Sequence, residues 1–175
     1  MPRARTWSET RIALFVAAGI LTLSLASRVE IPMVPVPLTL QSFVVVLIGA
    51  LGGWRLALVA IGAWLAAGAL GLPVLAGGTS GLDRFTGPTA GYLFAFPLAG
   101  ALVGWLVARG WDRTIWRLLG AMLLGHAVCL GLGAGWLATS MGLARALDAG
   151  LWPFLPGALL KSAAAALIVR ALRRR

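Results

Sequence analysis

Six long apolar stretches that are nearly free of charge make up most of the sequence. Of its 175 residues, 60% are hydrophobic and only 11% are charged. So little charge cannot form the polar surface that a soluble domain needs. A membrane-spanning helix takes roughly 20 apolar residues. We therefore expect an all-α integral membrane bundle, a single membrane domain over residues 1–175, with six transmembrane helices at about 12–27, 40–53, 56–75, 90–108, 118–141 and 152–172.

Arginine is distributed unevenly between the two sides of this bundle. An even number of spans places both termini on one side, where eleven arginines stand against two acids; the connectors of the other side hold three arginines and three acids. The positive-inside rule then makes the N- and C-termini cytoplasmic, in a bacterial inner membrane. Because these arginines lie in short loops, they indicate topology and contact with anionic lipid, and no nucleic-acid binding. The eleven are Arg3, Arg5, Arg11, Arg55, Arg109, Arg113, Arg117, Arg170, Arg173, Arg174 and Arg175.

The first apolar stretch allows a second interpretation. It follows basic residues and ends Ser24-Leu25-Ala26, which is similar to a signal-peptidase site. Cleavage there leaves five spans, with the new N-terminus outside.

Two irregular segments are expected to cover the outer end of the bundle. Three prolines forbid regular helix at 31–38 (IPMVPVPL), and non-helical chain at membrane depth is tolerated only where it is buried in protein or lines a cavity. The connector 76–89 (AGGTSGLDRFTGPT) is rich in glycine and hydroxyls. Polar residues near their junctions suit a largely apolar ligand with a few hydrogen-bonding groups, although each could equally be a solvated turn residue. They are Gln41, Thr79, Ser80, Asp83, Thr89 and Tyr92.

Lys161 lies within the last expected span, where an unpaired ammonium costs about 2.5 to 3.5 kcal/mol. No carboxylate stands within four residues of it, so a compensating anion must come from another segment, from water or from a ligand. This favours an anion-binding role in a water-filled pocket over a lysine that extends to the membrane surface.

Small residues spaced four apart allow close helix contacts in lipid. The pairs Gly100–Gly104 and Gly131–Gly135 are expected to pack inside the bundle, whereas Ala13–Ala17 could pack internally or dock another membrane protein. Trp136, well inside the fifth span, could be a core residue or a pocket wall.

Two catalytic interpretations are not favoured, the first because of its geometry and the second because of its sequence. Gly78-Thr79-Ser80-Gly81 fits a serine-protease motif with His126 as base, but His126 should lie some 18 Å below the outer face, and proton transfer needs about 3 Å. His126 is better explained as a histidine bonded to a neighbouring carbonyl or hydroxyl. The run Gly157 to Ser162 lacks the glycine that a phosphate-binding loop has before its lysine, so energy for uphill transport must come from a partner or an ion gradient.

Four sequence blocks, in order, closely resemble BioY, the biotin-specific substrate-binding (S) component family of energy-coupling factor (ECF) transporters. The blocks are VPVPLTLQ at 34–41, GLPVLAGG at 71–78, GPTAGYL at 87–93 with Phe96-Pro97, and PFLPG at 153–157 running into Lys161. The resemblance implies a six-helix bundle that binds biotin from outside. It also implies a transmembrane coupling protein and two ATPases as partners, with Ala13 and Ala17 at the docking position.

One position departs from the family pattern. Where the family has Asp three residues before the lysine, this chain has Ala158. Positions 158 and 161 share a helix face, so the family pair would place an acceptor for the ureido N–H groups beside the lysine. Our hypothesis is that Asp83, or the hydroxyls of Thr79 and Ser80, takes over ureido recognition.

The residues themselves predict a protein that binds a small amphiphilic anion. The resemblance implies that this anion is biotin and that the chain is a capture subunit, and we expect no catalytic residue, cofactor or metal. The alternatives are an intramembrane hydrolase using Ser80 and an assembly protein that binds no small molecule. The residues expected to bind the ligand are Lys161, Tyr92, Gln41, Thr79, Ser80, Asp83 and Trp136.

Overall fold

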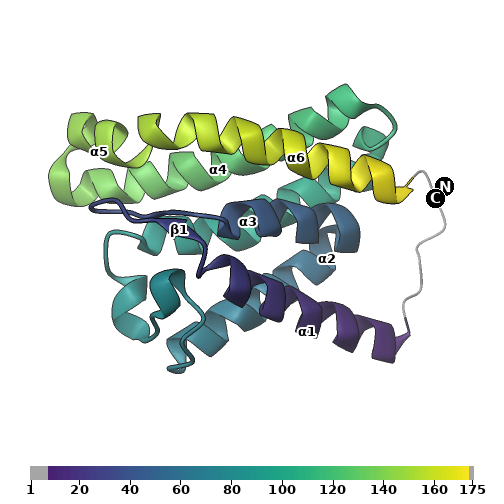
Figure 1. The fold of residues 1–175 in the computed structure, drawn as a ribbon, viewed down its shortest axis with the longest axis horizontal. Coiled ribbons are helices and arrows are strands. Elements are labelled where there is room, and N and C mark those ends of the chain that lie inside the picture. The colour runs from purple at the N-terminus through teal and green to yellow at the C-terminus, as the bar shows by residue number, and fades with distance from the viewer. Residues whose placement is uncertain (1–7, 174–175) are drawn as a thin grey trace.

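The computed structural model describes residues 8–173 and is mostly helical (Figure 1). Expectations that rest on Arg3, Arg5, Arg174 and Arg175 lie outside the described residues. The helices and strands are α1 (Glu9–Ala26), β1 (Glu30–Ile31), β2 (Leu38–Thr39), α2 (Gln41–Ala69), α3 (Ala90–Leu106), α4 (Ile115–Met141), α5 (Leu143–Gly150) and α6 (Leu155–Arg173). Short 3₁₀ turns occur at Ala76–Gly78, Leu82–Phe85 and Trp152–Phe154, and a π-helical turn at Val107–Trp111 follows α3.

Five helical stretches within residues 8–173 are long and apolar enough to cross a membrane. They are α1, α2, α3 with its π-helical turn, α4, and the continuous stretch of α5 and α6. This count differs from the six spans expected, because the expected helices 40–53 and 56–75 begin and largely run within one element, α2.

Helix α2 is bent into two arms at Gly53, where the backbone leaves helical geometry (φ 78°, ψ 172°). A β-carbon on Gly100 of α3 would lie 2.6 Å from Ile61 Cδ1 and 3.4 Å from the Val45 carbonyl oxygen. A straight helix would hold Val45 and Ile61 about 24 Å apart. Both arms of α2 therefore pack side by side against α3.

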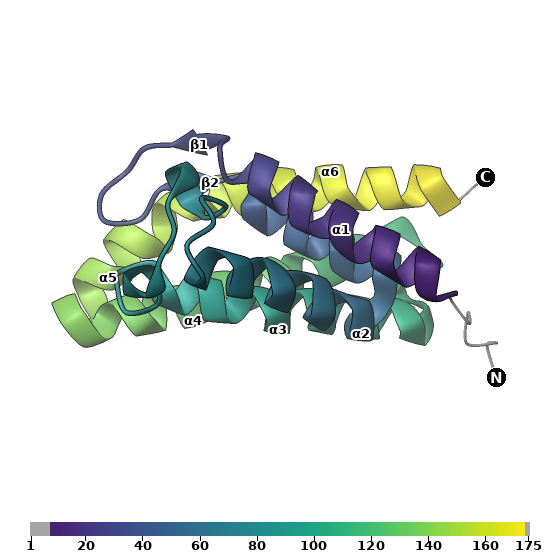
Figure 2. The same cartoon turned by 90° about the horizontal axis from the view of Figure 1, so that it is seen from below.

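The bundle has two distinct ends, which Figures 1 and 2 show. The β1–β2 hairpin, residues 70–89 and α5 lie at one end, called here the loop end. The first turn of α1 and the last turn of α6 lie at the other, called here the arginine end. Between them α2 packs against α3 and α1, while α4 packs against α3 and α6.

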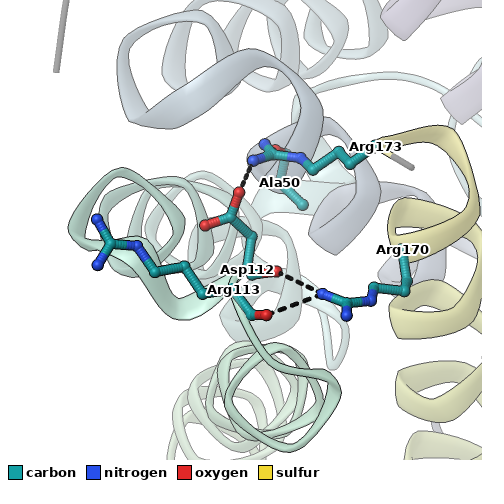
Figure 3. A network of polar contacts seen from close by, with 5 residues as sticks. All are labelled: Ala50, Asp112, Arg113, Arg170 and Arg173. Atoms are coloured by element: carbon teal, nitrogen blue, oxygen red, sulfur yellow. Dashed lines mark hydrogen bonds and ion pairs between the residues drawn. The ribbon is translucent and has the colours of Figure 1, made fainter. Parts of the chain in front are cut away.

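Arginines of α6 hold the arginine end together (Figure 3). Arg173 pairs with the Asp112 carboxylate and donates to the Ala50 carbonyl at 2.7 Å. Arg170 donates to the Asp112 and Arg113 carbonyls at 3.4 and 2.9 Å. These bonds connect α6 to the turn after α3 and to the first arm of α2.

Glycines permit the close contacts between α2 and α3. Gly49 lies against the backbone of Gly100, and a β-carbon on Gly104 would meet the backbone of Gly49, Gly53 and Trp54. The expected packing of Gly100 and Gly104 is therefore seen in the structure.

The corresponding expectation for Gly131 and Gly135 is wrong. Both are exposed, and no atom lies within 4 Å of where their β-carbons would stand, because they lie on the outward face of α4.

The proline-rich segment is more ordered than expected. Glu30–Ile31 pairs antiparallel with Leu38–Thr39, so residues 32–37 form the tip of a hairpin. Val34 is 95% exposed at this tip, whereas Val36 is buried against Tyr92, Leu130 and Phe154.

The short helix α5 (Leu143–Gly150) was not expected from the sequence.

We expect Gly104→Ala to lower the free energy of unfolding by about 1–3 kcal/mol, because the added methyl group meets backbone that cannot yield. Thermal unfolding of the detergent-purified protein measures this. Gly131→Ala, which meets no neighbouring atom, is the matched control and should not reduce stability. Equal melting temperatures for the two variants would contradict the packing described for α2 and α3.

Candidate functional site

A cavity of about 570 Å³ lies at the loop end, within the range typical of small-molecule sites. Its wall is built from the β1–β2 hairpin, the start of α2, residues 75–89, and the facing sides of α3, α4 and α6. Elements far apart in the chain thus contribute to one enclosed space. Apolar side chains such as Leu93, Phe96 and Leu130 supply much of the surface, with polar groups set among them.

Lys161 of α6 is half-buried and lines this cavity. Its Nζ donates to the Thr39 carbonyl at 2.5 Å and to Ser42 Oγ at 3.1 Å. Within residues 8–173 the ion pairs are Arg84–Asp83 and Arg173–Asp112, so no carboxylate of this region pairs with the ammonium. The hydrogen bonds connect α6 to the hairpin and to α2, and they leave the positive charge of Lys161 unneutralised beside the cavity.

Gln41 begins α2 and is almost completely buried at the cavity wall. Its Oε1 accepts a hydrogen bond from Thr39 Oγ1 at 2.9 Å, while its Nε2 has no partner within the described chain. The amide of Gln41 is therefore a donor available to a ligand acceptor.

Tyr92 of α3 lines the cavity. Its hydroxyl donates to the Gly150 carbonyl at 2.6 Å, and its ring stacks on Phe154 with centroids 6.2 Å apart. Gly133 allows this placement, because a β-carbon there would collide with the tyrosine ring. The Tyr92 hydroxyl thus holds α5 against the bundle.

Thr79 and Asp83 line the cavity at its rim. Thr79 Oγ1 donates to the Ala76 carbonyl at 2.9 Å. The Asp83 side chain is 74% exposed and pairs with Arg84 at 3.5 Å.

Ser80 and Trp136 were expected at the site but do not line the cavity. Thr79 has extended backbone geometry, and successive side chains of extended chain point to opposite sides, so Ser80 is directed away. Trp136 lies about two turns beyond Cys129 towards the end of α4, where its indole N–H donates to the Gly87 carbonyl at 3.1 Å and its ring packs edge-on against Phe94. The indole fastens the 71–89 loop to α4 from outside the cavity.

His126 of α4 is bonded as the sequence predicts, to a carbonyl and a hydroxyl. Its Nδ1 lies 3.0 Å from the Met122 carbonyl oxygen and 2.9 Å from Ser162 Oγ. No hydrogen bond joins it to Ser80 in the described chain, and its Nδ1 is bonded to α4 and α6 instead. Residues 8–173 also contain no cluster of three or more histidine, cysteine or acidic residues that could hold a metal ion.

Several residues of the cavity wall were not expected from the sequence. They are Glu30, Ser42, His126 and Cys129. Helical spacing was the available signal on α4, since His126, Cys129 and Leu130 share one face, whereas the sequence already placed Ala158 on the same face of the last helix as Lys161.

Ala13 and Ala17 lie far from this cavity, on the exposed face of α1. Helix α1 packs against α2 through its other face, where Gly19 and Leu23 are buried. A face of small residues therefore remains uncovered by the rest of the described chain.

Comparison with known proteins gives consistent matches along the chain. The model of the BioY family matches residues 1–175. A probable biotin transporter BioY from Pyrococcus horikoshii is 37% identical over 162 residues, covering 93% of each chain. The biotin transporter BioY of Rhizobium etli is 37% identical over 168 residues, covering 91% of this chain and 89% of the relative.

A solved structure has the same fold. The crystal structure of the S-component for biotin from an ECF-type ABC transporter superimposes with a TM-score of 0.86 at 28% sequence identity. The match covers 95% of this chain and 93% of the other.

We expect Tyr92→Phe to lower the free energy of unfolding by about 1–3 kcal/mol, because the buried Gly150 carbonyl loses its donor. Thermal unfolding in detergent measures the loss. Thr86→Val is the control, since it removes a hydroxyl bonded to a carbonyl at an exposed position. A stability loss no larger in Tyr92→Phe than in Thr86→Val would show that the tyrosine does not hold α5.

Proposed function

Because the chain belongs to the BioY family, we propose that it is the membrane-embedded subunit that captures biotin for uptake energised by a partner module. It is a multi-pass membrane protein and a transporter component, not an enzyme, and biotin is its cargo rather than a cofactor. The observation that carries the proposal is the cavity at the loop end, with the unneutralised ammonium of Lys161 on its wall.

The parts of biotin match the chemistry of this cavity. Biotin has a carboxylate, an apolar chain and thioether ring, and a polar ureido group. The ammonium of Lys161 can neutralise the carboxylate, and Leu93, Phe96 and Leu130 offer apolar surface to the chain and ring. The Gln41 amide supplies a donor for an oxygen of the ligand.

The two arms of α2 cross the membrane separately, which makes six crossings and one membrane domain over residues 1–175. Support comes from the reversal at Gly53 and from the placement of the start of α1 and the end of α6 at the same end of the bundle. The arginine end is cytoplasmic, because it carries most of the positive charge of residues 8–173, and its exposed arginines contact anionic lipid of a bacterial inner membrane. Biotin then enters from the outside, at the loop end.

The partner module consists of a transmembrane coupling protein and two ATPases, and it docks on α1. The exposed Ala13 and Ala17 support this, since small residues allow another helix to approach closely in lipid. The site itself lies elsewhere, on α2, α3, α4 and α6, so docking and ligand capture use different surfaces.

We expect Lys161→Ala to weaken biotin binding by about 1.5–3 kcal/mol, because the ligand's carboxylate loses a charged hydrogen-bond donor. Calorimetric titration of the purified protein with biotin and with biotin methyl ester measures this. The ester should bind wild type weakly and should be nearly insensitive to the substitution, and Lys161→Arg should retain part of the affinity. Unchanged biotin affinity in Lys161→Ala would remove the lysine from the site, and absence of biotin binding to wild type would overturn the proposed function.

We expect Ala13→Trp and Ala17→Trp to abolish co-purification with the coupling protein and ATPases, because an indole prevents close helix approach. Biotin affinity should stay at the wild-type value, since α1 does not line the cavity. Thr22→Trp, exposed on the same helix but facing another direction, is the control and should still co-purify. Full assembly of both alanine variants would exclude this face as the docking surface.

A further inference from the structure

Four buried side-chain polar atoms of residues 8–173 have no hydrogen-bond partner in the protein, and three of them belong to residues of the cavity wall. They are Glu30 Oε2, Gln41 Nε2 and His126 Nε2. Buried polar atoms in proteins are nearly always paired, so their concentration on one wall indicates what a ligand must offer there. Glu30 and Gln41 lie towards the loop end, whereas His126 is the lining residue of α4 nearest the arginine end.

The bonds at Nδ1 determine what Nε2 can do. His126 is 3% exposed, and its Nδ1 lies 3.0 Å from the Met122 carbonyl, which can only accept a hydrogen bond. We assign the proton of the neutral ring to Nδ1, as the donor to this carbonyl, which leaves a lone pair on Nε2. The Ser162 hydroxyl, 2.9 Å from Nδ1, holds the same edge of the ring to α6. The contacts at Nδ1 hold the imidazole ring on one edge, and Nε2 lies on the opposite edge.

Within residues 8–173, the residues of α4 and α6 that line the cavity beside His126 offer no stronger acceptor than its imidazole. Cys129, Leu130 and Ala158 are its neighbours on the wall, and they contribute a thiol and apolar groups. The ammonium of Lys161 donates to Thr39 and Ser42 of the hairpin and α2. An N–H group that enters this part of the cavity thus finds its acceptor in the imidazole.

We infer that His126 is a specificity-determining residue whose Nε2 accepts a hydrogen bond from an N–H of the bound ligand. The inference rests on the proposed function, under which this N–H belongs to the ureido group of biotin. The ring system then lies at the deep end of the cavity, and the carboxylate-bearing chain extends towards the loop end. Asp83, which sequence reasoning favoured for this role, stands at the rim with a largely exposed side chain.

The first experiment uses two substitutions that separate the nitrogens of the ring. His126→Asn keeps an amide near the Nδ1 position but deletes the acceptor, and His126→Gln places an amide oxygen near Nε2. Calorimetry should show biotin affinity reduced about 5- to 100-fold in His126→Asn, because a buried N–H is left unpaired, and largely retained in His126→Gln. Leu124→Ala, on the outward face of α4, is the control and should bind biotin as wild type does. Asp83→Asn is measured beside it, because Asp83 is the alternative acceptor for the ureido group.

The second experiment detects the hydrogen bond by nuclear magnetic resonance in the wild-type protein. The chain has one histidine, so ¹⁵N-histidine labelling marks a single ring. Addition of biotin labelled with ¹⁵N in the ureido group should shift the unprotonated Nε2 signal and produce an N–N coupling across the hydrogen bond.

The outcomes separate the two proposals. If wild type binds biotin but the Nε2 signal does not move, or if that nitrogen carries a proton in the complex, the inference fails while the proposed function stands. Undiminished biotin affinity in His126→Asn also overturns the inference. If Asp83→Asn binds biotin more weakly and His126→Asn does not, Asp83 is the acceptor for the ureido N–H. If wild type binds no biotin, the proposed function fails and the inference falls with it. Should His126→Asn not fold, the wild-type spectrum decides.

Discussion

The arrangement of the cavity depends on how one ammonium is accommodated in a bundle that carries little other charge. A lysine within apolar helices needs hydrogen-bond partners, since lipid supplies none. Lys161 finds them in the Thr39 carbonyl and the Ser42 hydroxyl, and these bonds hold the hairpin and the start of α2 against α6. The same contact that satisfies the lysine thus closes one wall of the cavity and leaves a positive charge facing it.

The two ends of the bundle satisfy their polar groups differently. At the arginine end, Arg170 and Arg173 donate to backbone carbonyls and to Asp112, so three segments are held by the protein's own groups (Figure 3). On the cavity wall, Gln41 and His126 keep polar atoms without a partner in the described chain. The arginine end is thus held by several internal hydrogen bonds, although Arg170 Nε is buried there without a partner, whereas the other unpaired atoms belong to residues that line the cavity.

The sequence predicted a residue's environment correctly where its chemistry allows few environments. The prediction failed where the environment depends on which helices lie beside the residue. Apolar runs must become helices in lipid, and a buried lysine must face a cavity or a partner. Equivalent glycine pairs, however, behave differently: Gly100–Gly104 lies between helices, while Gly131–Gly135 faces outward. The position of Trp136 in the sequence allowed either core packing or a place on the cavity wall. In the structure its indole N–H donates to the Gly87 carbonyl, and the ring lies outside the cavity.

Composition and spacing by themselves determined that the chain is a helical membrane protein with polar groups gathered towards one end, because these properties follow from transfer free energies and helix periodicity. Only the tertiary structure decided which polar groups share a wall. His126, Gln41 and Lys161 come from three helices, and their convergence depends on how α2 and α4 pack against α3 and how α6 packs against α4 and α2. A helix repeats its faces every 3.6 residues, but the face turned inward is set by the helices beside it.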